Sequence, residues 1–293
     1  MSCVAHFRQR VGRFGLSPRL RLATAIASAC LGAAALPMMV ENACASAIEL
    51  VAPSGIYADL AEQLGGNHLS IVVAERESEA QSRIHPGSIV LCSGAPKDDW
   101  LRDAARRISP PATVIAIPVM RPGNNDDIPV PWYDVKSIAT FTHMLADELM
   151  RRDPSMAPNI AGNLANADRA FQAVRQTIEE IARTYAHSDV IAADGLSRAV
   201  ARQVGFKAVP RAGELAKPAS VAIAEAIQRQ EGSIFLYDRD RPGSAMKKLA
   251  DMANDTGIPA AGLQEKLPRG LHYQQWALRQ WNTIRGALNQ ASQ

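Results

Sequence analysis

Cysteine is scarce in this chain. Of four cysteines in 293 residues, Cys3, Cys30 and Cys44 precede residue 48. The rest of the chain keeps only Cys92, which excludes an internal disulfide there. Because Cys92 ends the apolar stretch 88–92, we expect a buried thiol in a core strand, with a role in packing and none in chemistry.

A concentrated basic surface is also missing. The formal net charge is +3, and five of the 32 basic residues but only one of the 29 acidic residues precede Ile48. The 27 basic and 28 acidic residues that follow contain no dense basic run. A groove for nucleic acid is therefore excluded.

Catalytic signatures are absent as well. No nucleophile elbow, phosphate loop or dinucleotide glycine motif occurs in a strand–turn–helix context. Carboxylates do follow several candidate strands, but nothing in the sequence places a second functional group beside them. We therefore predict that the protein is not an enzyme.

The first 47 residues have the pattern of a secretory signal. An arginine-bearing start precedes the apolar run 22–40, and small residues follow at 43–47. We expect cleavage after Ala45 or Ala47 and a protein in the periplasm. A retained membrane anchor is a second interpretation, against which Pro37 and the Ala-x-Ala pattern argue. Lipid attachment at Cys30 is a third.

From Ile48 onward, short β-branched runs alternate with helical stretches, a pattern typical of parallel sheets covered by helices. The expected strands are 48–53, 70–74, 88–93, 113–119, 189–193, 207–210, 233–237 and 260–263. The expected helices between them are 57–64, 98–108, 197–204, 220–230 and 243–254. The fold class predicted is α/β, with two lobes, each a small, mainly parallel sheet flanked by helices.

The stretch 135–187 has no strand pattern and predicts mostly helix. Asp153-Pro154 should break it, and Ser155 should cap a second helix of about 30 residues, roughly 45 Å long at 1.5 Å per residue. Such a helix would brace two lobes with little closure between them. The predicted division is a signal peptide (1–47), an N-terminal lobe (48–134), a linking helical region (135–187) and a C-terminal lobe (188–293).

Several segments, in this order and spacing, resemble one known family. These segments are 51–66 (VAPSGIYADLAEQLGG), 132–134 (WYD), 218–223 (PASVAI), 233–237 (SIFLY), 249–257 (LADMANDTG) and 263–265 (LQE). They are similar to those of the TroA-like periplasmic metal-binding proteins of zinc and manganese ABC importers. The resemblance covers nearly all of the chain after residue 47. It implies a two-lobed binding protein that holds an ion between its lobes.

The family typically binds its ion with three histidines and one carboxylate. By the resemblance, the three histidine positions fall on Gln81, Val130 and Asp194, and the carboxylate position falls on Glu265. Val130 offers no donor and Gln81 only an amide oxygen, which disfavours a usual zinc site. Two carboxylates suit a harder cation with water in its shell, or an organic cation. The histidine-rich loop of many zinc-binding members is absent.

Individual candidates have competing interpretations. His85, four residues past Gln81 in a turn-like His-Pro-Gly segment, is either a substitute metal ligand or a surface turn residue. Asp194 and Glu265 follow predicted strands, where an α/β lobe presents its binding groups, but either residue can instead cap or be solvated. The candidate metal ligands are therefore Gln81, His85, Asp194 and Glu265.

The resemblance implies a monomeric protein that carries a divalent metal ion, zinc or manganese, to an ABC permease in the inner membrane. The alternative is a diverged member that has lost metal binding and takes another small solute or acts as an accessory interaction protein. Val130 and Gln81 favour the alternative, whereas Asp194 and Glu265 favour metal transport.

Overall fold

The computed structural model describes residues 47–94, 96–118, 130–210, 218–240 and 243–293. All of them belong to one unit that begins at Ala45. Residues 1–46, which are all but the last residue of the predicted signal peptide, lie outside the described residues. Within these ranges, no helix is long and apolar enough to cross a membrane.

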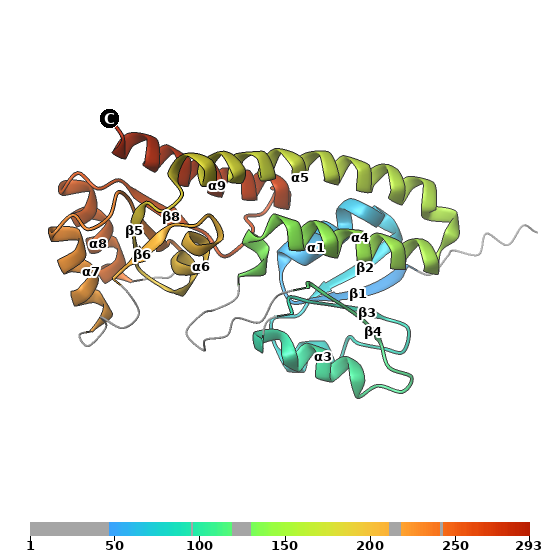
Figure 1. The fold of residues 1–293 in the computed structure, drawn as a ribbon. Coiled ribbons are helices and arrows are strands. Elements are labelled where there is room, and N and C mark those ends of the chain that lie inside the picture. Colours follow the sequence, from blue (N-terminus) through green and yellow to red (C-terminus); the bar gives the residue numbers. More distant parts are fainter. Residues whose placement is uncertain (1–46, 95, 119–129, 211–217, 241–242) are drawn as a thin grey trace, which may run out of the picture. The chain divides into compact units, whose positions relative to one another are not determined.

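The first sheet is parallel, with strand order β2-β1-β3-β4 (Figure 1). Its strands are β1 (Ile48–Ala52), β2 (Leu69–Val73), β3 (Ile89–Cys92) and β4 (Thr113–Ala116). Its helices are α1 (Gly55–Gly65), α2 (Glu77–Gln81) and α3 (Asp99–Arg106), with short 3-10 turns η1 (Gly66–His68) and η2 (Pro96–Asp98). Gly66 ends α1 with φ 51°, a left-handed conformation that favours glycine.

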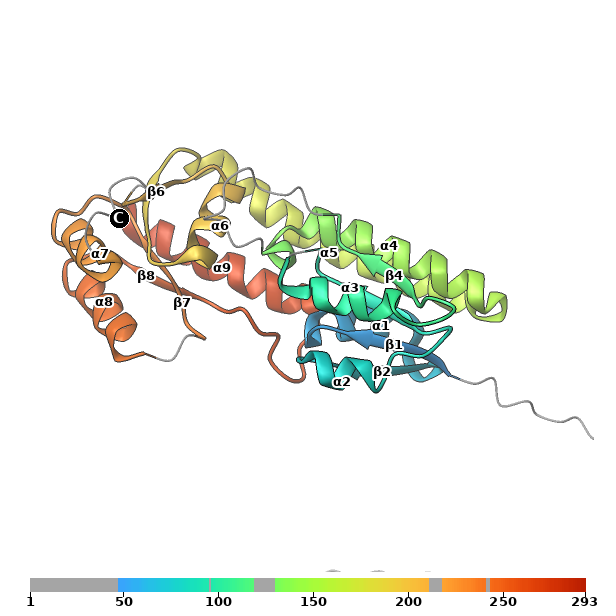
Figure 2. The same cartoon turned by 90° about the horizontal axis from the view of Figure 1, so that it is seen from below.

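The second sheet repeats this design, with parallel strands in the order β6-β5-β7-β8. Its strands are β5 (Asp189–Ala192), β6 (Lys207–Val209), β7 (Phe235–Asp238) and β8 (Ala260–Leu263). Its helices are α6 (Gly195–Gln203), α7 (Ala219–Gln228) and α8 (Ser244–Asp255). The predicted two-lobed α/β fold is thus confirmed. Figure 2 shows the same elements from below.

Three long helices pack beside the lobes. They are α4 (Val135–Arg152), which follows η3 (Pro131–Tyr133), α5 (Ala157–Tyr185), which follows η4 (Pro154–Met156), and α9 (Tyr273–Ala291). Helix α5 packs against α1 and α4 of the first lobe and against α9, which contacts β8 of the second. Its 29 residues span about 44 Å. The break at Asp153-Pro154 is confirmed, but Ser155 is not the cap.

Asp153 performs the capping expected of Ser155. The Asp153 carboxylate accepts hydrogen bonds from the backbone N–H of Ser155 at 3.0 Å and from its hydroxyl. The turn begins at Pro154, so its cap lies two residues before the predicted one, and Ser155 donates to that cap. The rule that a short polar side chain caps the first free amides still holds.

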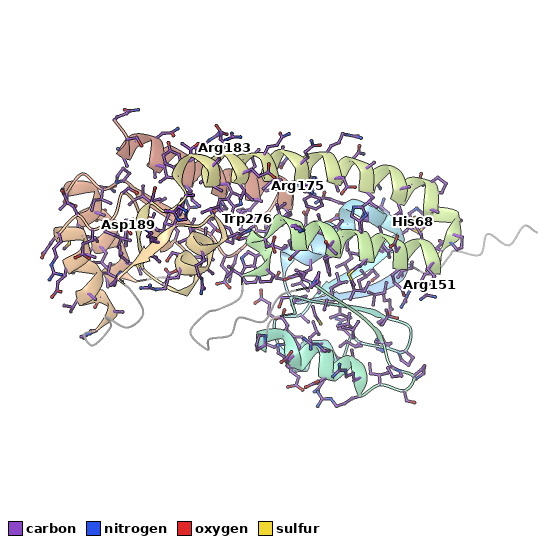
Figure 3. The ribbon with its side chains drawn as sticks, viewed as in Figure 1. His68, Arg151, Arg175, Arg183, Asp189 and Trp276 are labelled. Atoms are coloured by element: carbon purple, nitrogen blue, oxygen red, sulfur yellow. The ribbon has the colours of Figure 1, made fainter. Side chains whose placement is uncertain are left out.

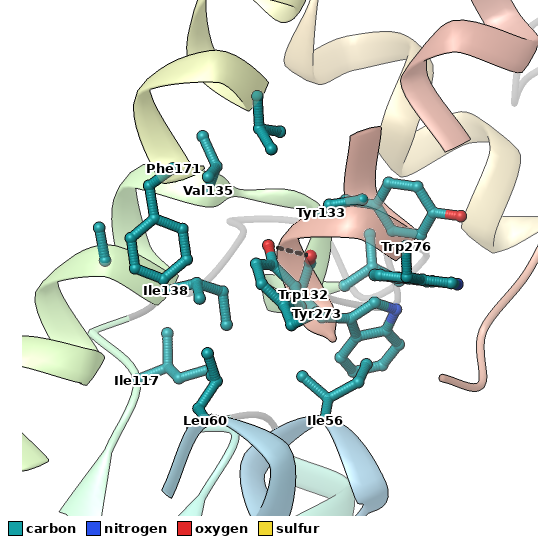
Figure 4. Packing of buried hydrophobic residues seen from close by; sticks show 14 of the residues in the cluster. Ile56, Leu60, Ile117, Trp132, Tyr133, Val135, Ile138, Phe171, Tyr273 and Trp276 are labelled. Carbon is teal, nitrogen blue, oxygen red and sulfur yellow. Dashed lines mark hydrogen bonds between the residues drawn. The ribbon is translucent and has the colours of Figure 1, made fainter. Parts of the chain in front are cut away.

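The hydrophobic core continues through both lobes. One cluster contains residues of β1, α1, α4, α5, α9, β5 and β7, and smaller clusters fill the outer faces of the two sheets. Cys92 is 0% exposed in β3, which confirms its predicted packing position. Figure 4 shows part of the main cluster, where Trp132, Tyr133, Tyr273 and Trp276 meet.

Candidate functional site

A pocket of about 420 Å³ lies where residues after strands of both sheets come together. Its described lining comprises residues 53–57 after β1, Glu75 after β2, Asp98 and Trp100 after β3, Trp132, and residues 265–267 after β8. In parallel α/β sheets, ligands bind beyond the carboxyl ends of the strands, beside the point where strand order reverses. The neighbouring strands β1 and β3 form that point in the first sheet.

A larger groove of about 740 Å³ lies elsewhere, between the end of α1 and the start of α5. Asn67, Asn159, Asn163 and Asn166 are among its lining residues. Its described lining comes from α1, η1, η4 and α5, and none of these residues directly follows a strand. The 420 Å³ pocket is therefore the candidate site, and it is called the cleft pocket below.

Two carboxylates of the first lobe line the cleft pocket. Glu75 lies two residues past β2, and its backbone N–H donates to Glu79 at 3.1 Å. Asp98 is 5% exposed, and its Oδ2 accepts a hydrogen bond from the backbone N–H of Ser93 at 3.0 Å. Asp98 therefore stabilises the turn that follows β3, and it also forms part of the pocket wall.

Tyr57, in the first turns of α1, forms another part of this wall. It is 1% exposed, and its hydroxyl makes no hydrogen bond of normal geometry among the described residues. Burial, and then the charge of Asp98, raise the pKa of Tyr57 well above its usual value, and the nearby Ser93 hydroxyl offsets this only in part. The phenol therefore stays protonated and keeps a proton to donate.

Aspartates order the opposite edge, in the second lobe. Asp194 Oδ2 accepts from the backbone N–H of Asp238 at 2.7 Å, and Asp238 Oδ1 accepts from the N–H of Asp240 at 2.9 Å. Asp240 Oδ2 accepts from the N–H of Glu265 and of Lys266, at 2.8 and 3.0 Å. These three aspartates, the acidic ladder, tie the ends of β5, β7 and β8 together and fix the backbone that presents Glu265.

Asp194 also caps α6. Its Oδ1 accepts from the backbone N–H and the hydroxyl of Ser197, both at 2.9 Å, and the Ser197 hydroxyl bonds back to the Asp194 backbone. This is a capping box, so the N-cap interpretation of Asp194 is confirmed. Both carboxylate oxygens of Asp194 are therefore engaged by the second lobe itself.

The structure brings the four predicted ligands to different places. Glu265 lines the cleft pocket, and Asp194 connects to it through the acidic ladder. Gln81 lies at the exposed end of α2, donates to Glu77 at 2.9 Å and lines a different hollow beside α3. His85 is exposed, and its backbone N–H donates to the Ser88 hydroxyl at the start of β3.

Sequence reasoning missed Glu75, Asp98 and Tyr57. Glu75 directly follows the expected strand 70–74, and Asp98 opens an expected helix after another strand. The strand-end rule that singled out Asp194 and Glu265 therefore applied to these residues too. Val130, which offers no donor, is buried in the main core.

Trp132, which lines the cleft pocket, belongs to a core cluster that also contains other large aromatic residues. Tyr133, Tyr273, Trp276 and Trp281, here called the aromatic seam, have ring centroids 5.4–6.0 Å apart. The Tyr273 hydroxyl donates to the backbone oxygen of Trp132 at 2.8 Å, as drawn in Figure 4. The Tyr133 hydroxyl donates to the backbone oxygen of Gln264 at 2.8 Å. Trp276 is labelled in Figure 3.

A further polar contact joins α1 to the start of α9. Asp59 Oδ1 lies 2.8 Å from His272 Nδ1, and Asp59 Oδ2 accepts from the backbone N–H of Tyr273 at 2.7 Å. Since α1 belongs to the first lobe and α9 packs on the second, this contact and the aromatic seam hold the two walls of the cleft pocket at a defined separation.

The donors of the cleft pocket are oxygens. No histidine or cysteine of the described residues lines it. Among those residues, no group of three or more histidine, cysteine, aspartate or glutamate side chains is placed to hold a metal ion. The walls therefore offer carboxylates and hydroxyls around open space and do not form a closed coordination shell.

No family model matches the sequence, and no curated protein is significantly similar to it. Solved structures are similar in fold. A periplasmic metal-binding protein from Candidatus Liberibacter asiaticus superposes with a TM-score of 0.64 at 13% identity, covering 82% of this chain and 99% of that one. The Mn-bound form of that protein gives a TM-score of 0.62 at 13% identity, with the same coverage.

A solute-binding protein from Pseudomonas aeruginosa, FpvC in complex with Mn²⁺, gives a TM-score of 0.62 at 16% identity. It covers 83% of this chain and 98% of that one. Identity at this level reports on the fold alone, and the fold is matched over almost the whole of each neighbour. The chain therefore has the two-lobed α/β fold of periplasmic metal-binding and solute-binding proteins.

Proposed function

We propose that this chain is a periplasmic solute-binding protein that takes up a divalent metal ion between its lobes and delivers it to the permease of an ABC importer. The observation that carries the proposal is the cleft pocket, which has carboxylates from both lobes at the carboxyl ends of two parallel sheets. The presence of manganese in two neighbours of the same fold supports the choice of ligand.

The architecture supports transport better than catalysis. A carrier needs a site whose two walls come from different lobes, so that a permease can engage both, and the cleft pocket meets this requirement. We propose that the protein acts as a monomer and has no catalytic activity. Glu265 is the predicted ligand with the strongest support, while Gln81, His85 and Asp194 remain proposals.

The alternative is a diverged member that binds another small solute or acts as an accessory interaction protein. It is favoured by the lack of a ready coordination group among the described residues and by the burial of Val130 in the core. Both functions share the cleft pocket and differ in the ligand.

Titration calorimetry separates them. The purified chain is stripped of metal with a chelator and titrated in turn with Zn²⁺, Mn²⁺, Fe²⁺ and Cu²⁺. We expect saturable heat with one equivalent of at least one ion. Absence of heat with all four ions would overturn metal transport in favour of the alternative.

A further inference from the structure

A hollow of about 480 Å³ lies on the second lobe, where α9 packs beside β8 (Figure 1). This hollow, here called the arginine hollow, is lined by Arg239 after β7, Gly262 of β8, Gln264 directly after β8, and Arg279, Gln280, Asn282 and Thr283 of α9. None of these residues lines the cleft pocket. We infer that the arginine hollow is a second binding site, which takes the phosphate group of a soluble phosphate ester or of a lipid headgroup.

The arginine hollow carries positive charge that nothing in the described structure compensates. Arg239 and Arg279 are both exposed, and neither forms an ion pair with another described residue. No acidic residue is part of the described lining. Asp240, next to Arg239 in sequence, uses its Oδ2 to accept from the backbone N–H groups of Glu265 and Lys266. A phosphate monoester, which carries about −1.5 to −2 charges at pH 7, matches two guanidinium groups in charge.

The buried side of the arginine hollow is built from a pair of glutamines. Gln280 is 4% exposed, and its Oε1 accepts from the backbone N–H of Gln264 at 2.9 Å. Its Nε2 donates to the Oε1 of Gln264 at 3.2 Å. The side-chain oxygen of Gln264 is thus engaged, whereas its NH₂ group has no acceptor among the described residues. An available amide donor beside two guanidinium groups suits an anion and not a cation.

Gly262 keeps the space beside Arg239 open. A Cβ atom at this position would lie 3.0 Å from the Tyr237 hydroxyl oxygen and 3.2 Å from the Cβ of Arg239. Any side chain at residue 262 would therefore press on the stem of Arg239 and fill part of the hollow. The close approach of β8 to Arg239 thus depends on glycine.

Geometry and size favour a phosphate ester over a carboxylate. The donors come from three elements, the end of β7, the end of β8 and one side of α9. A tetrahedral phosphate presents oxygens in several directions, and the planar fork of arginine can bind two of them at once. A phosphate group about the size of three waters fills roughly 90 Å³, so a hollow of about 480 Å³ also has room for the rest of the ester.

The test titrates the purified chain in phosphate-free buffer of low ionic strength, because salt screens exposed charges. The soluble probes are glycerol 3-phosphate and, as the neutral comparison, glycerol. The lipid probes are phosphatidylcholine vesicles with and without phosphatidic acid. We expect saturable binding of glycerol 3-phosphate, of the vesicles that contain phosphatidic acid, or of both, and none of glycerol or of pure phosphatidylcholine. Binding of the vesicles alone identifies a lipid headgroup as the source of the phosphate, and binding of glycerol 3-phosphate identifies a soluble ester.

The variants separate a specific site from attraction to surface charge. Arg239→Gln and Arg279→Gln should each weaken phosphate binding at least about tenfold, since each loses a charged, bidentate donor. Arg183→Gln, on the exposed side of α5 and labelled in Figure 3, removes the same charge outside the lining and should leave affinity unchanged. Arg279→Lys keeps the charge but loses the planar fork, so it should still weaken binding several-fold.

Both lining arginines are exposed, so their variants should fold like the parent chain, which thermal unfolding checks. If neither phosphate monoester bound saturably, or if Arg183→Gln weakened binding as much as Arg239→Gln and Arg279→Gln, the arginine hollow would not be a phosphate site. The metal titration of the cleft pocket would be unaffected by either result, because the two sites share no lining residue.

Discussion

The aromatic seam and the acidic ladder both join strands and helices that are distant in sequence, but they do so by opposite means. In the seam, large rings are buried between the lobes, and their hydroxyls bond to backbone oxygens. In the ladder, carboxylates bond to backbone amides along one edge of one sheet. The seam fixes the distance between the lobes, and the ladder fixes the shape of one wall.

This difference separates two tasks that a binding cleft requires. Apolar burial scales with buried area and supplies most of the stability. Carboxylate-to-amide hydrogen bonds contribute less energy but specify direction. Changes in the seam should therefore act mainly on folding, whereas changes in the ladder should act on the local backbone that presents Glu265.

The largest effect is expected in the seam. Trp276 is 1% exposed and packs against Tyr133 and Tyr273. Trp276→Ala should lower the free energy of unfolding by about 3–5 kcal/mol, because it removes a large buried ring and leaves a cavity. Chemical denaturation measures the loss. A decrease below about 1 kcal/mol would show that the seam does not hold the lobes.

Trp276→Phe is the matched control for that change. The indole N–H of Trp276 has no hydrogen-bond partner among the described residues, so phenylalanine keeps an aromatic ring and removes an unsatisfied donor. We expect a decrease much smaller than that of the alanine variant. If the two variants lost equal free energy of unfolding, the stability would come from the shape of the indole ring and not from the area that it buries.

The ladder should give a smaller effect. Asp194→Ala removes the N-cap of α6 and the acceptor for the Asp238 amide. We expect the free energy of unfolding to fall by about 1–2 kcal/mol, as for other lost caps. Titration of the same variant with Mn²⁺ separates the two roles of Asp194. A loss of ion affinity of a hundredfold or more would favour its predicted role as a metal ligand over that of a cap.

Much of the fold could be predicted from the sequence because its signals are local. Every described strand begins within two residues of its predicted start, and the long helix α5 was expected at nearly its full length. Helix α9 was not predicted, although Tyr273, Trp276, Ala277 and Trp281 already have helical spacing. The alternation of β-branched runs with helical stretches indicates the two sheets, but it gives no signal for a helix that follows the last strand.

The site could be predicted less well from the sequence, because it depends on how the loops after the strands are placed in three dimensions. Spacing along the chain pointed to Gln81, whereas the residue that reaches the cleft pocket from that loop is Glu75, two residues past β2. Gln81 is the last residue of the short helix α2, which begins two residues after Glu75. The unsatisfied hydroxyl of Tyr57 has no sequence signal at all, since a tyrosine in the first turns of an amphipathic helix predicts only core packing.

The smallest expected effect is on the pH dependence of stability, through the thiol of Cys92. It tests whether water is excluded from β3, behind the cleft pocket, as it is from the aromatic seam. Burial, and then the charge of Asp98, raise the pKa of Cys92 to about 12. The unfolded thiol ionises near pH 8.5. The folded state therefore holds this proton where the unfolded state has lost it, so the stability from the neutral thiol is complete below about pH 8 and is lost as pH rises toward 12.

Between pH 7.5 and 9.5 this linkage should lower the free energy of unfolding by about 1 kcal/mol. Other groups titrate in the same range, so the decisive measurement is the difference between the parent chain and Cys92→Ala, which keeps them all and lacks the thiol. The alanine variant should lose about 1 kcal/mol less over this interval in chemical denaturation. Identical pH dependence in the two proteins would mean that the Cys92 thiol ionises as easily in the folded chain as in the unfolded one. Water would then reach β3 from the cleft pocket, and the edge that carries Asp98 would be open, unlike the seam.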